Sequence, residues 1–133
     1  MAALGTALAA FLLTSIFLLA APPPALAATD HVVGGPDSMW CIPPSAGLYE
    51  AWAANTTFVA GDNLVFRFEM GFYDVVLVSK KEYDDCTAGD PYNSFSAGPA
   101  VVPLEAGVHY YVCSVGNYCS LGVKFFVTVQ NPQ

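Results

Sequence analysis

Thiols and imidazoles are the side chains of this sequence best able to bind a metal or to attack a substrate. There are four cysteines and two histidines, namely Cys41, Cys86, Cys113 and Cys119 with His31 and His109. Two imidazoles and a thiolate can hold copper in a trigonal plane, and a thiol beside an imidazole can act as a nucleophile. In an oxidising compartment cysteines tend instead to pair, and four of them allow three complete pairings.

His109 and Cys113 are the histidine and cysteine closest to each other in the sequence. They lie four residues apart on a predicted strand, 108–112, that ends just before the cysteine. Both side chains therefore share one face, but they are about 13 Å apart at about 3.3 Å per residue. At that separation they can neither share a metal ion nor act as nucleophile and base, and no third group is present to orient them. The sequence predicts that the protein is not an enzyme.

Glu82, Asp84 and Asp85 form an acidic group within a predicted helical turn, 80–85. Calcium binding requires oxygen ligands that converge from a loop of suitable spacing, and no such spacing is present. We expect these carboxylates to form a solvated face of the turn.

Residues 1–27 have the organisation of a secretory signal peptide. An apolar run over 9–21 is followed by three prolines and then by Ala25-Leu26-Ala27, a small–large–small pattern of the kind that precedes cleavage. A membrane anchor or a buried helix is the alternative, but the run is short for a bilayer core of about 30 Å. We expect cleavage after Ala27, a single mature domain over 28–133, and neither a membrane span nor a lipid anchor in it.

The net charge of the chain indicates which classes of binding partner are unfavourable. The chain carries a formal net charge of −7, and every charged residue lies in the expected mature domain. An acidic surface disfavours nucleic acid and anionic membranes as partners. Asn55-Thr56-Thr57 is an acceptor sequence for N-linked glycosylation, and we expect Asn55 to lie on a surface turn and to be glycosylated.

Short extended segments separated by Gly, Pro, Asn and Asp dominate the mature sequence. Leu64, Phe66 and Phe68 alternate with polar or smaller residues, as in a strand with one buried face. The apolar segment 74–79 does not alternate, which indicates a strand covered on both faces. Such segments predict an all-β fold, a Greek-key sandwich of two sheets with one or two short helical turns. The predicted strands are 31–33, 64–69, 74–79, 100–104, 108–112 and 123–129, with helical turns at 49–54 and 80–85.

The last third of the chain carries the most specific pattern. Residues 110–124, with the sequence YYVCSVGNYCSLGVK, strongly resemble the C-terminal copper loop of the phytocyanins, which are plant blue-copper proteins of the cupredoxin fold. The resemblance extends over essentially the whole mature chain. It includes 30–35, Trp40, Trp52, Phe58, 61–66, 74–78, 83–86 and 96–100. It implies a cupredoxin sandwich and electron transfer as the activity of the parent family.

The resemblance also locates four copper-ligand positions. A phytocyanin with a working site has a histidine just before the strand that matches 74–79, and a cysteine at the end of the penultimate strand. A second histidine follows five residues later, and an axial Met or Gln five residues after that. This sequence has Tyr73, Cys113, Tyr118 and Val123 at those positions, so Cys113 is the one retained ligand. Neutral phenols, with a pKa near 10, are poor ligands. The resemblance therefore implies that no copper cofactor is bound.

Tyr73 and Tyr118 have two interpretations. Their rings fill the space of the missing imidazoles and metal, or they form a paired aromatic surface for a sugar, a phenolic or a peptide. Tyrosine has an apolar face and a polar tip, which suits such contacts. Both interpretations stay open at the level of sequence.

The disulfide pattern is likewise implied by the resemblance. Cys86 and Cys119 match the family's disulfide positions, and closing that loop stabilises a small domain by roughly 3–4 kcal/mol in the chain-entropy model. Cys41 then remains with Cys113. These two residues form a second disulfide, or they are two buried free thiols.

The sequence favours a secreted phytocyanin-like protein that acts outside the cell, in the apoplast or at the outer face of the plasma membrane. We expect a non-redox binding or structural module, similar to early nodulin-like members that lack copper ligands. Its partner would be an extracellular ligand such as a cell-wall glycan, a phenolic or a protein. The alternative is a copper-binding electron-transfer protein with an atypical site. Stoichiometric copper would distinguish the two.

Overall fold

The structure is a computed structural model that describes residues 5, 12–16, 18 and 27–132. Most of the predicted signal peptide, residues 1–27, lies outside the described residues. Within the part of the chain that is described, no helix is both long and apolar enough to cross a membrane.

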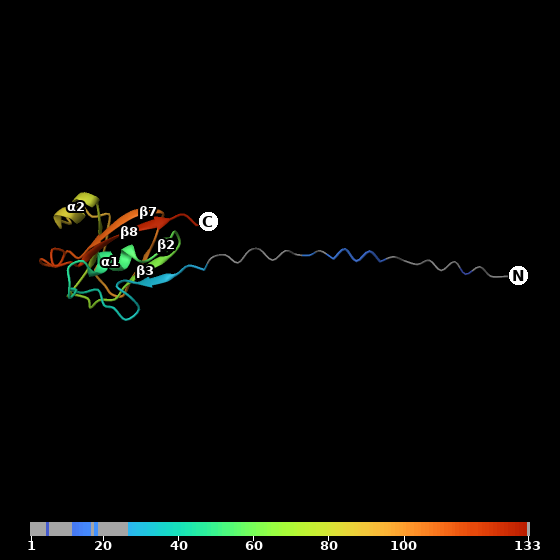
Figure 1. The fold of residues 1–133 in the computed structure, drawn as a ribbon, viewed down its shortest axis with the longest axis horizontal. Coiled ribbons are helices and arrows are strands. Elements are labelled where there is room, and N and C mark those ends of the chain that lie inside the picture. The colour runs from blue at the N-terminus through green and yellow to red at the C-terminus, as the bar shows by residue number, and fades with distance from the viewer. Residues whose placement is uncertain (1–4, 6–11, 17, 19–26, 133) are drawn as a thin grey trace.

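Two mixed sheets form the body of the molecule (Figure 1). The smaller sheet has the strand order β1-β3-β6, and the larger has the order β2-β8-β7-β4-β5. β1 pairs with β3, and β2 with β8, in parallel, whereas the other pairs are antiparallel. The elements are β1 Asp30–Val32, α1 Leu48–Ala54, β2 Phe58–Val59, β3 Asn63–Phe66, β4 Val75–Val78, α2 Lys80–Asp85, β5 Asn93–Phe95, β6 Ala100–Pro103, β7 Gly107–Val112 and β8 Lys124–Gln130. The predicted two-sheet sandwich with short helices is confirmed.

The interior lies between the two sheets and is rich in aromatic rings. Trp40 is fully buried at its centre, with ring centroids 5.2 Å from Phe66 and 5.7 Å from Phe125. Leu64, Phe66 and Phe68 all point inward, as their alternation predicts. Clustered rings bury large apolar areas, so this layer is the main source of stability in the domain.

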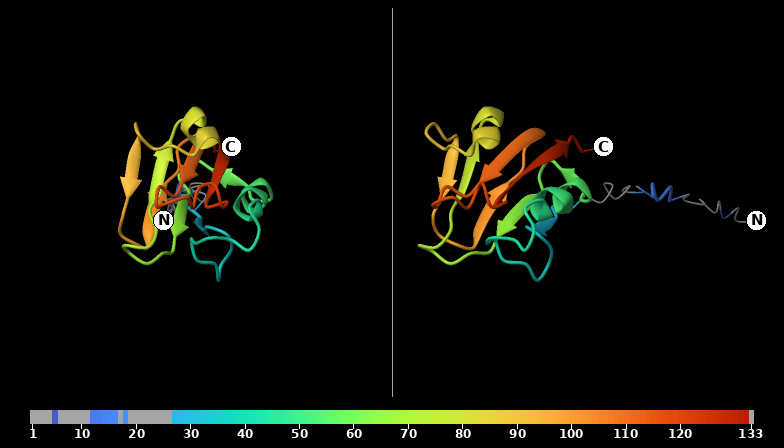
Figure 2. Two further views of the ribbon diagram at one scale, coloured as in Figure 1. Left: turned by 90° about the vertical axis from the view of Figure 1, so that its left-hand side faces the viewer. Right: turned by 60° about the vertical axis from the view of Figure 1, so that its left-hand side comes forward.

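β4 is apolar on both faces because a helix covers its outer side. Val75 packs into the main core, whereas Val76 and Val78 pack with Tyr83 of α2 in a second cluster. α2 begins at Ser79, whose hydroxyl accepts a hydrogen bond from the backbone N–H of Glu82 at 3.2 Å. The uninterrupted apolar segment is thus explained by the two layers on either side of the strand (Figure 2).

Two strands were not predicted from the sequence. β2 has two residues, and β5 is a three-residue edge strand with the sequence NSF. Neither is long enough to show alternation. They form because the edges of β8 and β4 offer free backbone hydrogen-bonding groups.

Candidate functional site

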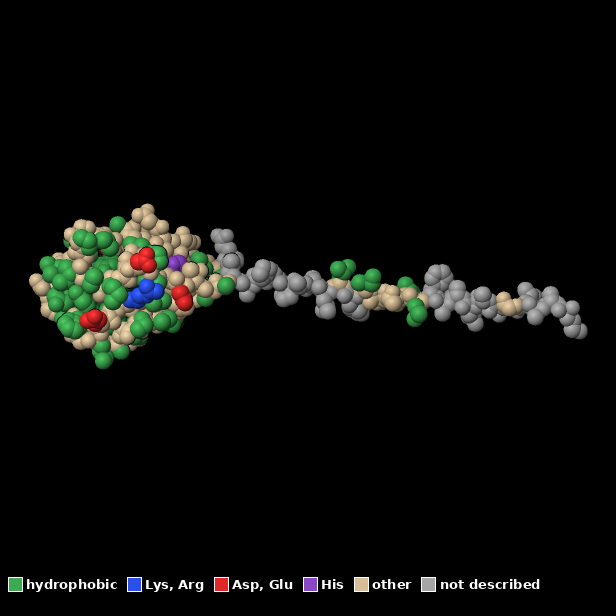
Figure 3. Space-filling view, turned by 90° about the horizontal axis from the view of Figure 1, so that it is seen from below, with side chains coloured by type: hydrophobic (Ala, Val, Ile, Leu, Met, Phe, Trp, Pro, Cys, Tyr) green, Lys and Arg blue, Asp and Glu red, His purple; other side chains and the backbone are tan. Residues whose placement is uncertain are grey.

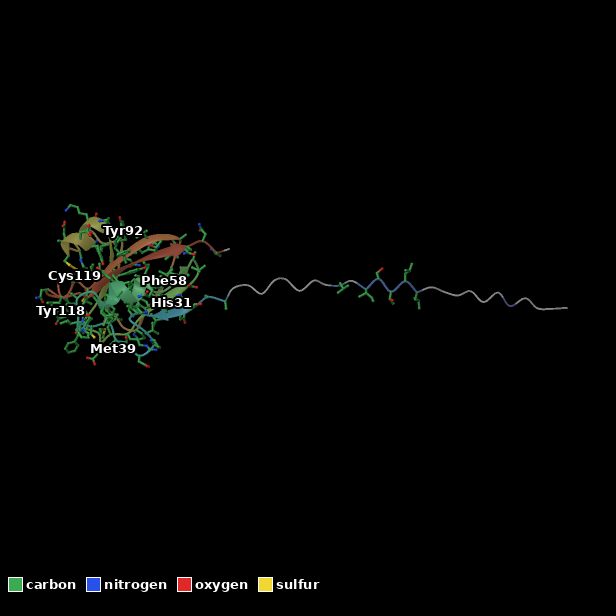
Figure 4. All side chains as sticks on the ribbon, viewed as in Figure 1. His31, Met39, Phe58, Tyr92, Tyr118 and Cys119 are labelled. Carbon is green, nitrogen blue, oxygen red and sulfur yellow. A yellow bond between two sulfur atoms is a disulfide. The ribbon has the colours of Figure 1, made fainter. Side chains whose placement is uncertain are left out.

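The four positions singled out from the copper-loop pattern come together at one end of the sandwich. Tyr73 precedes β4, Cys113 follows β7, and Val123 precedes β8. Tyr118 lies in the loop between β7 and β8, at the end of the body opposite His31 (Figure 4). Cys113 and Val123 are buried, and the two half-buried tyrosines pack against the same core.

The rings of Tyr73 and Tyr118 are in direct contact. Their centroids are 5.3 Å apart, with the planes tilted by 38°. Aromatic pairs at this spacing attract each other through dispersion and quadrupole terms. The two residues therefore form a single aromatic unit, built from segments that are 45 residues apart in the sequence.

Asp74 connects the start of β4 to the segment that follows β7. Its carboxylate accepts hydrogen bonds from the backbone N–H of Ser114, at 2.7 Å, and from the hydroxyl of the same serine. Its carbonyl oxygen accepts a hydrogen bond from Nε1 of Trp40 at 2.8 Å. Asp74 thus fixes the residues beside Tyr73 and Cys113 relative to the core. Sequence reasoning missed this role, and the only available signal was its position at the start of a buried strand.

Cys113 is a buried thiol whose ionisation is unfavourable. Burial raises its pKa to about 11, because the desolvation cost and the nearby Asp74 carboxylate outweigh backbone hydrogen bonds that act in the opposite direction. Only the thiolate form is a good nucleophile or metal ligand. At neutral pH the retained ligand position therefore holds a protonated thiol.

Cys86 and Cys119 form a disulfide with a Cα–Cα distance of 5.6 Å. It joins the end of α2 to the loop that carries Tyr118. Cys41 and Cys113 are free thiols in the structure, so the second disulfide considered from the sequence is not formed. Cys113 is buried as the free-thiol interpretation predicts, whereas Cys41 is only half-buried.

Tyr49 organises the chain around Cys41. Its hydroxyl accepts a hydrogen bond from the backbone N–H of Cys41 at 3.0 Å and lies 2.7 Å from the carbonyl oxygen of Met39, to which it donates. Burial raises the pKa of Tyr49, which therefore stays neutral. This buried phenol supports the loop that follows Trp40 against the core.

The side chains at this end do not suit a type-1 copper ion. His31 pairs with Asp62 at 2.9 Å, and Nε2 of His109 lies 2.7 Å from the carbonyl oxygen of Glu105. Neither histidine joins Cys113, and residues 5, 12–16, 18 and 27–132 contain no group of three or more His, Cys, Asp or Glu side chains placed to hold a metal. One protonated thiol, two phenols and a valine do not provide the imidazole–thiolate plane that such copper requires.

Exposed apolar residues lie next to the tyrosines in the chain. Met70 and Phe72 are 72% and 62% exposed; the backbone of Met70 forms a β-bridge with that of Tyr73, and Phe72 directly precedes Tyr73. Leu121, on the same loop as Tyr118, is 41% exposed. The space-filling view shows hydrophobic atoms gathered over this end of the body, at the left of the picture (Figure 3). An apolar surface with aromatic rings at its centre is typical of a binding site.

Comparisons with known proteins agree with this architecture. The family model described as a plastocyanin-like domain matches residues 40–123. The structure superposes on cucumber stellacyanin, a Cu²⁺ protein, with a TM-score of 0.71 and 32% identity, over 80% of this chain and 100% of that one. The chain belongs to the phytocyanins.

Two plant proteins illustrate how similar this phytocyanin is in sequence to its relatives. It is 35% identical over 103 residues to a blue copper protein of Arabidopsis thaliana, covering 77% of this chain and 52% of that protein. It is 33% identical over 127 residues to early nodulin-like protein 14 of the same plant, covering 94% of this chain and 66% of that protein. The phytocyanin therefore spans about half the length of the blue copper proteins it matches.

Proposed function

We propose that this phytocyanin is an extracellular binding module that works without copper. The observation that carries the proposal is the contact of Tyr73 with Tyr118, at 5.3 Å, where a copper phytocyanin would have its two histidines. In this proposal, the two tilted rings form an aromatic surface at the place where copper phytocyanins bind the metal. Such a surface is suited to a planar phenolic, to the apolar face of a sugar ring or to a peptide side chain.

The surroundings of the pair support binding rather than redox chemistry. Met70 and Phe72, near Tyr73 in the chain, and Leu121, on the loop of Tyr118, are exposed apolar side chains. Beside the loop that carries Tyr118 lies a groove of about 300 Å³, whose lining includes the polar side chains of Asn117 and Ser120. Aromatic rings next to uncharged hydrogen-bonding groups are a common composition for ligand sites.

Electron transfer through an atypical copper site is the second candidate function. It is favoured by one observation, the free thiol of Cys113 at the ligand position. Copper could displace the thiol proton, because metal binding and thiol ionisation are coupled. The side chains around Cys113 nevertheless supply no imidazole to complete the site.

The two functions are separated by one experiment on the natively secreted protein. Free thiols are counted by mass spectrometry after alkylation, and copper is quantified on the same sample. Two free thiols without copper support the binding module. One equivalent of copper bound through Cys113 would reject it and assign the protein to electron transfer.

The binding surface itself is tested by calorimetric titration with two probes, a hydroxycinnamic acid and a β-linked glucan oligosaccharide. Replacing both Tyr73 and Tyr118 by alanine is expected to weaken binding of the recognised probe by at least tenfold, about 1.4 kcal/mol. Tyr92→Ala is the matched control, because Tyr92 is a 72% exposed tyrosine outside the pair. Equal affinities in the double variant and the control would show that the pair only fills space.

A further inference from the structure

A second groove lies between α1 and the outer face of β8. It has a volume of about 300 Å³. β2 pairs with only the last two residues of β8, so the earlier part of that strand has α1 as its neighbour on this side (Figure 1). The groove is lined by Glu50, Ala53, Ala54, Thr56, Thr57, Phe58, Phe126, Thr128 and Gln130.

Asn55 stands at the rim of this groove. Ala54 and Thr56, on either side of it in the sequence, both line the groove, as does Thr57, which completes the acceptor sequence. Asn55 is exposed at the C-terminal end of α1, where its Nδ2 donates a hydrogen bond to the carbonyl oxygen of Ala51 at 3.0 Å. Glycosylated asparagine keeps one N–H, so this hydrogen bond can persist and fix the direction in which a sugar leaves.

The floor of the groove suits a sugar ring. Phe126 is 44% exposed, and its ring is held by Tyr110 and Tyr83, with centroids at 5.9 Å and 6.1 Å. Thr128 and Gln130 follow on the same face of β8 and offer hydroxyl and amide groups. Thr128 is two residues from Phe126, about 7 Å along the strand, and both line the same groove as Ala54 and Thr56, the two sequence neighbours of Asn55.

We propose that this groove is the seat of an N-linked glycan on Asn55, whose first sugars pack on Phe126. In the modification, Nδ2 of Asn55 forms a bond to the anomeric carbon of a lipid-diphosphate-linked oligosaccharide. The bond from that carbon to the diphosphate breaks, and the amide proton is lost to the transferase. A tethered sugar has an effective concentration in the millimolar range, so weak stacking is sufficient to hold it.

Seating the glycan has two consequences for the molecule. It covers an exposed aromatic ring on β8 that would otherwise contact other molecules. It also links the end of α1 to the larger sheet, because both line the groove. The glycan thereby stabilises the native state and leaves the surface around Tyr73 and Tyr118 free.

The test uses the full chain secreted from a glycosylating eukaryotic host, with Phe126→Thr as the key variant. Val101→Thr is the matched control, because Val101 is also an exposed strand residue, 54% accessible, but lies on β6 of the other sheet. Intact mass gives the occupancy of Asn55, and the rate of enzymatic removal of the glycan from the folded protein gives its accessibility. We expect an occupied site and removal about fivefold faster in Phe126→Thr than in wild type or control, as loss of one aromatic contact predicts.

Thermal unfolding supplies an independent readout through a double-mutant cycle with Asn55→Gln. Asn55→Gln should lower the unfolding temperature of the wild type and have no further effect in Phe126→Thr. An unmodified Asn55 would overturn the proposal. Equal removal rates with additive thermal effects would also overturn it, because the glycan would then project into solvent. Neither result bears on the proposed role of the tyrosine pair.

Discussion

Exchanging histidine for tyrosine at a metal-ligand position replaces a neutral nitrogen donor by a phenol that is protonated at neutral pH. The resemblance places Tyr73 and Tyr118 at two such positions, and the two phenol rings are in contact with their planes tilted by 38°. The resemblance places Val123, which is fully buried, at the axial position, and its side chain has no donor atom. In the proposed function, these three residues make this end a packed aromatic surface in place of a metal-binding one.

Reversing those substitutions tests how much of the site geometry survives. Tyr73→His, Tyr118→His and Val123→Met together should give stoichiometric copper binding and an intense visible thiolate-to-copper absorption band. We expect this without prior reduction, because Cys113 is a free thiol. The measurement is a copper titration followed by absorption spectroscopy. The same triple variant carrying Cys113→Ser should stay colourless, and colour that appears only after reduction would reveal a Cys41–Cys113 disulfide.

Asp74 is the residue on which the alignment of the two loops depends. Asp74→Ala removes the acceptor for two hydrogen bonds from Ser114, so we expect a loss of about 1–3 kcal/mol in the free energy of unfolding. Urea denaturation measures it. Asp84→Ala is the control, because Asp84 pairs only with the exposed Lys80, and exposed pairs contribute little. Equal losses in the two variants would rule out the positioning role of Asp74.

At the scale of elements, α2 and the loop after β7 are covalently joined. The Cys86–Cys119 disulfide spans 33 residues and connects the helix that covers β4 to the loop that carries Tyr118. The helix would otherwise be held mainly by Tyr83, whose ring packs near Tyr110 and Phe126. The position of the loop that carries Tyr118 therefore depends on the Cys86–Cys119 disulfide, which lies outside the main core.

Replacing Cys86 and Cys119 by serine should lower the free energy of unfolding by roughly 3–4 kcal/mol, because the unfolded chain regains the entropy of an open loop. Chemical denaturation measures the loss. Cys41→Ser, a change at a half-buried free thiol, is the control and should have a much smaller effect. A loss in the double variant no larger than in the control would mean that packing alone holds the helix.

At the scale of the whole molecule, the buried carboxyl of Asp62 couples stability to pH at the end distant from the tyrosines. Burial acts to raise the pKa of the Asp62 carboxyl, but hydrogen bonds from His31 and from the backbone N–H groups of Thr29 and Val59 lower it overall. A carboxyl with a lowered pKa stabilises the folded state above its unfolded pKa, near 4, and this contribution is lost as pH falls through the folded pKa.

We therefore expect the free energy of unfolding to decrease below about pH 4 in the wild type. Asp62→Asn should be less stable than the wild type at neutral pH and should show a weaker decrease in acid. Urea denaturation over a pH series measures both effects. Asp90→Asn, at an exposed carboxyl, is the control. An unchanged acid profile in Asp62→Asn would assign the pH dependence to other carboxyls.

The sequence by itself determined the family and the two-sheet sandwich, because these depend on residue types at fixed spacings. Alternation at Leu64, Phe66 and Phe68 is a local property, and so is the absence of histidine at Tyr73 and Tyr118. The short strands β2 and β5 were missed because their pairing depends on the edges of other strands.

Only the tertiary structure decided which distant groups meet. The contact of Tyr73 with Tyr118, the hydrogen bonds from Ser114 to Asp74 and the groove beside Asn55 all bring together segments that are remote in sequence. Such contacts are set by how the two sheets pack and by how the loops at their ends fold over them. No local pattern of residues encodes these distances, since they arise only once the whole core has assembled.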